Sequence, residues 1–106
     1  MIIRFTPSVE RRLAKIVESH CRSAVQRARI ERELATALRR ISDFPLIHGQ
    51  VREFPGCPAR QFIVEPYRFF YVVDEPRNAV WIVDIWHRRE KPVAPWIPPP
   101  AEEHPK

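Results

Sequence analysis

The sequence is poor in the residues from which covalent and metal-bound scaffolds are built. It contains two cysteines, Cys21 and Cys57, which lie far apart and form neither a CxxC pair nor a Cys/His cluster. A disulfide framework needs more cysteines than two, and a zinc site needs a cluster of Cys or His ligands, so neither fits this chain. We therefore expect a protein of a reducing compartment that uses no metal and no cofactor.

Long hydrophobic runs are absent as well. No apolar stretch approaches the roughly 18 residues that span a bilayer, and the opening segment MIIRFTPSVERR turns charged too early for a secretion signal. We expect a soluble, cytoplasmic protein without a membrane partner.

Glycine is rare, with two residues, whereas proline is abundant, with twelve. Half of the prolines fall in the last fifteen residues, which can therefore form neither a helix nor the interior of a sheet. The length of 106 residues suits a single domain. We predict one domain over residues 1–91 and a proline-rich, extended or disordered tail over residues 92–106.

Basic residues outnumber acidic ones by 18 to 13, which gives a formal net charge of +5. The excess lies mainly in residues 1–43, with ten basic and five acidic residues, because residues 60–91 contain six and five. A positive balance favours an anionic partner such as nucleic acid, the ribosome or an acidic protein.

Two amphipathic helices are predicted for the first half of the chain. Residues 2–5 form a short apolar segment typical of an edge strand, and Thr6 and Pro7 then mark a helix start, as a capping hydroxyl before a proline. The apolar positions at helical spacing are Val9, Leu13, Ile16 and Val17, and then Ala24, Val25, Ala28, Leu34, Ala35, Leu38 and Ile41. Phe44 and Pro45 end the second stripe, since proline cannot continue a helix. The two stripes predict a helical hairpin.

Strand-forming residues dominate from Arg60 onward. Three β-rich runs cover residues 60–64, 67–73 and 79–86, and the short breaks between them suit hairpins. We predict a three-stranded antiparallel meander, which the strand near Ile2 extends to a three- to four-stranded antiparallel sheet. The helical hairpin packs on one face of this sheet, so the fold class is α+β.

The order of these elements, together with the sequence of the last three strands, resembles the RelE/ParE superfamily of type II toxin–antitoxin toxins. The resemblance is carried by Phe44-Pro45, by residues 66–74 (PYRFFYVVD) and by residues 83–89 (VDIWHRR). Members show a Tyr-Arg pair opening a strand that ends in an aromatic-Tyr pair and an acidic turn. A later strand closes in His or Lys followed by arginine. The match covers residues 2–91 and implies a RelE/ParE-like fold, a toxin function and a small, acidic antitoxin as partner.

The chain also departs from both branches of the superfamily. RelE-like ribonucleases often carry a lysine pair on the first meander strand, and alignment on the Tyr-Arg pair places those positions at Ala59 and Gln61. The gyrase-inhibiting ParE branch often has a glycine after the histidine of the last strand, whereas Arg88 follows His87 directly. The proline-rich tail replaces the short C-terminal helix of some members.

Ribonucleases of this kind use the RNA's own 2′-hydroxyl as nucleophile, so the protein only transfers protons and stabilises charge on the phosphate. By resemblance, Arg68 is the candidate for the phosphate, because a guanidinium binds two phosphate oxygens at once. His87 is the candidate general acid or base, and Arg88 a second phosphate-contacting or catalytic residue. We predict these three as the catalytic set, with Arg60 and Tyr71 as substrate-binding residues.

The register of the last hairpin decides which side chains share a face with Arg68, because side chains alternate along a strand. If paired residue numbers sum to an even number, Arg68 shares its face with Asp84, Trp86 and Arg88. If they sum to an odd number, the set is instead Trp81, Val83, Ile85 and His87. Asp84 is an acid inside an apolar strand, which we interpret as an ion-pair partner of an arginine, with a catalytic base as the alternative.

Three functions remain open at this point. The first, which we favour from the sequence over the other two, is a ribosome-dependent mRNA endonuclease, metal-independent and neutralised by its antitoxin, in which the ribosome orients the RNA. The second is a non-enzymatic inhibitor of DNA gyrase, which fits the missing lysine pair. The third is an inactive homologue retained as an antitoxin-binding partner. We expect the antitoxin to bury apolar surface near residues 9–17 or on the open face of the sheet.

Overall fold

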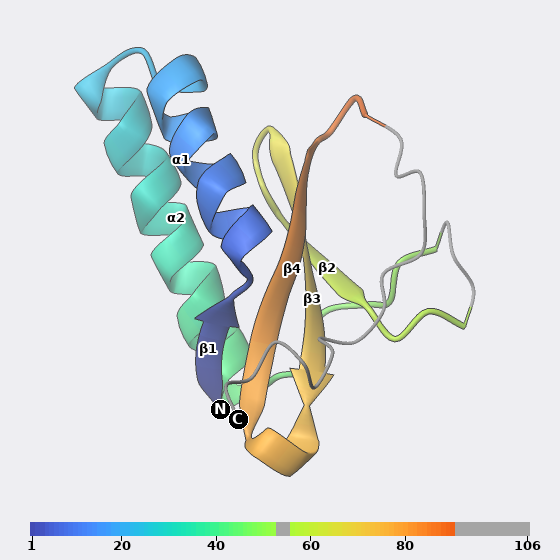
Figure 1. The fold of residues 1–106 in the computed structure, drawn as a ribbon. Helices are drawn as coiled ribbons and strands as arrows, with labels where there is room; N and C mark the ends of the chain where they lie inside the picture. Colours follow the sequence, from blue (N-terminus) through green and yellow to red (C-terminus); the bar gives the residue numbers. More distant parts are fainter. Residues whose placement is uncertain (53–55, 91–106) are drawn as a thin grey trace.

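A computed structural model describes residues 1–52 and 56–90 and shows two layers, a pair of helices against one side of a four-stranded sheet (Figure 1). The elements in chain order are β1 (Ile2–Phe5), α1 (Pro7–His20), α2 (Ala24–Asp43), β2 (Arg60–Val64), β3 (Tyr67–Asp74), the 3-10 helix η1 (Glu75–Arg77) and β4 (Ala79–His87). The predicted tail over residues 92–106 lies outside the described residues. Among those described, no helix is both long and apolar enough to cross a membrane.

Both helices begin and end where local sequence rules place them. The Thr6 hydroxyl accepts a hydrogen bond from the backbone N–H of Val9 at 3.4 Å, and the Ser23 hydroxyl accepts one from Gln26 at 3.0 Å. These hydroxyls satisfy N–H groups that have no partner inside the first helical turn. Helix α2 ends with the Phe44 N–H bonded to the Arg40 carbonyl, immediately before Pro45. The predicted helical hairpin is confirmed.

The sheet is mixed, so the prediction of a purely antiparallel sheet was wrong for β1. The strand order is β1-β4-β3-β2, and β1 pairs with β4 in parallel, whereas the other two pairs are antiparallel. The helical hairpin returns the chain to its starting end, where the Met1 ammonium donates to the Ser42 carbonyl at 2.8 Å. The next three strands alternate in direction, so β4 runs the same way as β1.

Each face of the sheet contributes to a separate apolar cluster. We call the side toward α1 and α2 the helix face and the other side the open face. The main core lies on the helix face and includes Val9, Ile16, Ile30 and Ile41 of the helices with Phe62, Val64, Tyr67, Phe69, Tyr71, Val80, Ile82 and Ile85 of the sheet. On the open face, Phe70 and Val72 pack against Val51, Cys57 and Ala59 of the segment before β2.

A β-bulge divides the β3–β4 hairpin into two registers. From Tyr67↔His87 to Phe70↔Asp84 the paired numbers have an even sum, and from Tyr71↔Ile82 onward they have an odd sum. Val83 is the extra residue that β4 inserts at this shift. Both registers that the sequence left open therefore occur, and the even one governs the end of the sheet that carries Arg68.

Candidate functional site

Arg68 lies on the open face, opposite Trp86 of β4. Its Nε and Nη2 atoms both donate to Oε1 of Gln61 on β2, at 3.0 and 2.7 Å, and its guanidinium lies 5.1 Å from the centre of the Phe70 ring. Gln61 occupies one of the two positions at which RelE-like ribonucleases often carry lysine. Here its side-chain amide fixes the orientation of the arginine instead of adding a second positive charge.

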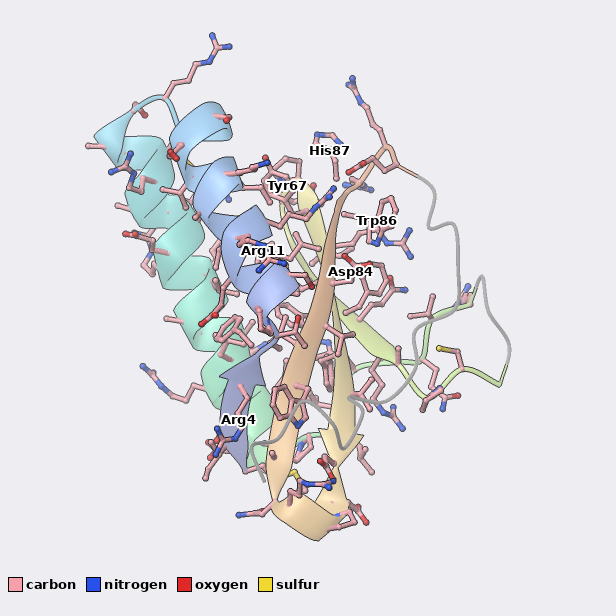
Figure 2. All side chains as sticks on the ribbon, viewed as in Figure 1. Arg4, Arg11, Tyr67, Asp84, Trp86 and His87 are labelled. Atoms are coloured by element: carbon pink, nitrogen blue, oxygen red, sulfur yellow. The ribbon has the colours of Figure 1, made fainter. Side chains whose placement is uncertain are left out.

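Asp84 and Trp86 share the open face with Arg68, and Figure 2 shows both on the side of β4 away from the helices. The Asp84 carboxylate accepts a hydrogen bond from the backbone N–H of Ile85 at 2.9 Å and one from the Trp86 indole at 2.8 Å. Both of these donors are neutral groups of residues on its own strand. The carboxylate holds the indole in place at the edge of the site.

Arg4 and Arg68 lie over aromatic rings of the open face, and Arg12 reaches the Trp86 ring from α1 at the edge of β4, beyond the residues that pair with β1. Their guanidinium carbons are within 6.0 Å of ring centres in the pairs Arg4–Trp81, Arg12–Trp86 and Arg68–Phe70. Cations in this position are attracted by the electron-rich faces of the rings. The open face therefore carries the charges of Arg4 and Arg68 above aromatic rings, and the charge of Arg12 lies at the border between the two faces.

Arg88 follows the last residue of β4 and continues the ladder, because its N–H donates to the Pro66 carbonyl at 2.8 Å. By the even register it shares the open face with Arg68. Its guanidinium donates to the Glu65 carboxylate at 2.6 Å, and both side chains of this pair are more than half exposed. Exposed ion pairs contribute about 1 kcal/mol or less, so Arg88 can exchange Glu65 for another anion at little cost.

His87 points to the helix face, away from Arg68. Its ring stands edge-on to Tyr67 at 5.6 Å, and its Nδ1 accepts a hydrogen bond from the Arg89 N–H at 3.1 Å. Figure 2 shows both rings at the end of the sheet beside α1. A pocket of about 460 Å³ opens there, lined by Arg12, Lys15, Ile16, Ser19, Tyr67, His87 and Glu90. The predicted catalytic set is thus divided, with Arg68 and Arg88 on one side of the sheet and His87 on the other.

The two predicted substrate-binding residues both anchor the segment that follows α2. Arg60 donates from Nη1 to the His48 carbonyl at 2.6 Å, and the Tyr71 hydroxyl donates to the Pro45 carbonyl at 2.8 Å. Tyr71 has no exposed surface, and burial raises its pKa above the usual value of 10, although His48 and Arg60 partly oppose this effect. The hydroxyl partner expected for Tyr71 is therefore a backbone group in the core, which leaves the ring out of reach of a substrate.

Sequence reasoning did not single out Gln61 as a partner of Arg68, nor Arg12 and Lys15 as neighbours of His87. The first contact is diagonal across β2 and β3 and depends on the register of that hairpin. The second depends on where α1 crosses the end of the sheet. Arg12 and Lys15 are three residues apart and therefore share one helical face, which is the only signal the sequence offers.

Comparisons with known proteins agree with this fold. A family model described as the ParE toxin of the type II toxin–antitoxin system parDE matches residues 3–92. No protein of curated function matches the chain by sequence. Solved structures with the same fold include the isolated Escherichia coli RelE toxin, with a TM-score of 0.61 and 15% identity, covering 85% of this chain and 86% of that one.

Two further similar structures contain an antitoxin. The intact E. coli RelBE toxin–antitoxin complex matches with a TM-score of 0.56 and 15% identity, covering 80% of this chain and 97% of that one. An E. coli RelE variant with two arginines changed to alanine, in complex with a RelB peptide, has a TM-score of 0.58 and 16% identity, covering 85% and 84%. With a family model that spans most of its length and a RelE-like fold, this chain belongs to the RelE/ParE superfamily of type II toxin–antitoxin toxins.

Proposed function

We propose that this toxin arrests growth without cutting RNA, as a non-enzymatic inhibitor of DNA gyrase that a cognate antitoxin holds inactive. The observation that carries the proposal is the separation of Arg68 from His87 by the sheet. Cleavage through the RNA's 2′-hydroxyl needs a proton acceptor, a proton donor and a charge-stabilising group around one phosphate. An imidazole on the helix face cannot serve a phosphate held by Arg68 on the open face.

Two further features support this reading. The lysine pair of RelE-like ribonucleases is replaced by Ala59, which is fully buried, and by Gln61, which is held by Arg68. The family model that matches describes ParE toxins. Inhibition of an enzyme by binding requires a complementary surface and no proton-transfer group. The separation of Arg68 from His87 is therefore compatible with gyrase inhibition.

A second candidate is the ribosome-dependent mRNA endonuclease. It is favoured by the presence of Arg68 and Arg88 on one face, where two guanidiniums can bind one phosphate. Asp84 lies on the same face, and its carboxylate could accept a proton there while it also accepts the Trp86 indole N–H. In this mechanism the ribosome supplies the remaining orientation of the RNA.

Two assays on the same toxin separate the candidates. Purified protein is added to DNA gyrase in a supercoiling assay, and mRNA ends are mapped by primer extension after induced expression. Inhibited supercoiling with intact mRNA supports the proposal. Codon-phased cuts that disappear in Arg68→Ala, with normal supercoiling, establish the endonuclease instead. Absence of growth arrest would point to an inactive homologue and contradict both.

We also propose that the antitoxin covers the apolar groove along α1. The groove has a volume of about 550 Å³ and is lined by Phe5, Leu13, Ala14 and Val17, with Glu10 and Glu18 at its borders. Exposed apolar surface of this kind marks a protein-binding site, and it coincides with the residues 9–17 predicted for the antitoxin. Leu13→Glu should abolish co-purification with the product of an adjacent short, acidic reading frame, whereas Val25→Glu, at an exposed position of α2, should not.

A further inference from the structure

We propose that the pocket between α1 and the ends of β3 and β4 is a phosphate-binding site, in which Arg12, Lys15 and His87 bind a phosphate monoester. The proposal concerns the end of the sheet beside α1, where Arg12 also contacts the Trp86 ring, and does not depend on which activity the toxin has. Its basis is the convergence of side chains from three elements on one half-enclosed pocket of about 460 Å³, which lies within the usual size range of small-ligand sites.

The pocket gathers hydrogen-bond donors in excess of the acceptors available to them. Arg12 and Lys15 come from α1, and His87 from the end of β4. The Nδ1 atom of His87 accepts a bond from the Arg89 N–H, so the ring proton of the neutral imidazole is on Nε2, which is a donor. Lys15 has no hydrogen-bond or ion-pair partner within the described part of the chain. An anion would satisfy these groups together.

The carboxylate of Glu90 occupies part of the proposed phosphate site. Its carboxylate lies 3.2 Å from Arg12 and also accepts the backbone N–H of His87 at 2.6 Å. Both side chains of the Arg12–Glu90 pair are more than 40% exposed, and such a pair is weak because water screens it. The site therefore holds an internal carboxylate that an external anion can displace.

The donor set suits a phosphate better than a second carboxylate. A carboxylate has two oxygens in one plane, and Glu90 uses its oxygens on Arg12 and on the His87 backbone while Lys15 remains without a partner. A phosphate monoester presents three terminal oxygens in different directions and carries more charge. The half-enclosed pocket also has an apolar wall at Ile16 and the Tyr67 ring, against which the organic part of the ligand can pack.

The test is titration of the full chain with inorganic phosphate, adenosine 5′-monophosphate and a 5′-phosphorylated hexanucleotide, followed by calorimetry and by NMR of the His87 ring protons. Both phosphate monoesters should bind and shift the His87 signals. Arg12→Ala and Lys15→Ala should each weaken binding about tenfold or more, because each removes one charge-assisted hydrogen bond. Glu90→Gln should strengthen binding about threefold or more, because the internal competitor is lost.

Arg11→Ala is the matched control. It removes the same charge from the adjacent position of α1 (Figure 2), but Arg11 does not line the pocket, so its affinity should change less than about twofold. Tighter binding of the hexanucleotide than of the mononucleotide identifies the end of a nucleic acid strand as the ligand, and the reverse identifies a free nucleotide. Equal loss in Arg11→Ala and Arg12→Ala, unshifted His87 signals, or tighter binding of a hexaglutamate peptide would each overturn the proposal.

Discussion

Arg68 and Trp86 face each other across β3 and β4, and the next pair along the ladder, Tyr67 and His87, projects to the opposite side of the sheet. Because side chains of successive pairs point to opposite faces, the arginine and the histidine lie on different sides of the sheet. The Arg68 guanidinium over the Phe70 ring occupies the open face, and the His87 imidazole, with Arg12 and Lys15 of α1 around the same pocket, occupies the helix face.

This separation predicts that Arg68→Ala and His87→Ala act independently. Their effects on the free energy of unfolding should add within about 0.5 kcal/mol, as is usual for sites that share no contact. The pair Arg68→Ala and Gln61→Ala should deviate from additivity by about 0.5 kcal/mol or more, because these two side chains are hydrogen-bonded. Urea unfolding of the single and double variants measures both couplings. Strong coupling of Arg68 to His87 would contradict the assigned register.

Substitution of Ile82 and of Ile63 tests which positions of the sheet belong to the core. Ile82 is completely buried on the helix face, whereas Ile63 is 52% exposed on β2. Ile82→Ala should lower the free energy of unfolding by about 2–5 kcal/mol, since it leaves a cavity among packed side chains. Ile63→Ala should change it by about 0.5 kcal/mol or less. Equal losses in the two variants would be incompatible with this packing.

The two tyrosines predict a loss of stability at alkaline pH. Burial is the main cause that raises the pKa of Tyr67 and of Tyr71 above 10. The unfolded chain releases these phenol protons at lower pH than the folded chain. The contribution of the two tyrosines to the free energy of unfolding is therefore complete below pH 10 and is lost as the pH rises through their pKa values in the folded protein. Urea unfolding between pH 8 and 11 should show this decline.

The double variant Tyr67→Phe/Tyr71→Phe removes every tyrosine of the chain and should flatten the decline. Absorbance at 295 nm, read on the wild-type protein during the same pH series, should show that phenol ionisation accompanies unfolding. An equally steep loss of stability in the double variant would assign the effect to other groups.

His48 predicts a loss of stability on the acid side. Burial, and to a smaller extent the charge of Arg40, lowers its pKa below 6.5. The unfolded chain therefore takes up a proton at this ring at a higher pH than the folded chain. The stabilising contribution is present above pH 6.5 and is lost as the pH falls below it. Unfolding free energies of the wild type and His48→Gln, measured from pH 7.5 to 5, should converge toward the acid end, and parallel curves would refute the assignment.

Structural features that depend on residues close in sequence could be predicted, and features that depend on contacts between distant segments could not. Thr6 and Pro7 fix the start of α1 through local hydrogen bonds, and the boundaries of β2 follow from strand-forming residues between turn signals. The parallel pairing of β1 with β4 depends on where the chain returns after the helical hairpin and the two intervening strands, which no local pattern encodes.

The divided site has the same explanation. Strand parity correctly defined the alternatives for Arg68, but the bulge at Val83 allows both registers in one hairpin, and no turn residue announces it. Tyr71 was predicted as a substrate-binding residue, and its hydroxyl donates to the Pro45 carbonyl because the segment after α2 folds back over β3. In each case a contact between distant segments decided the outcome.

The pairing of Ile2 with Ala79 has a consequence for synthesis on the ribosome. A growing chain makes β1 first and β4, the strand with which β1 pairs among the described residues, last, so the sheet closes only after nearly the whole domain has emerged. Until then the apolar stripes of the two helices lack the surface that they cover in the finished molecule. A truncated translation product that lacks β4 would therefore leave β1 without this partner strand and the apolar stripes of the helices partly uncovered.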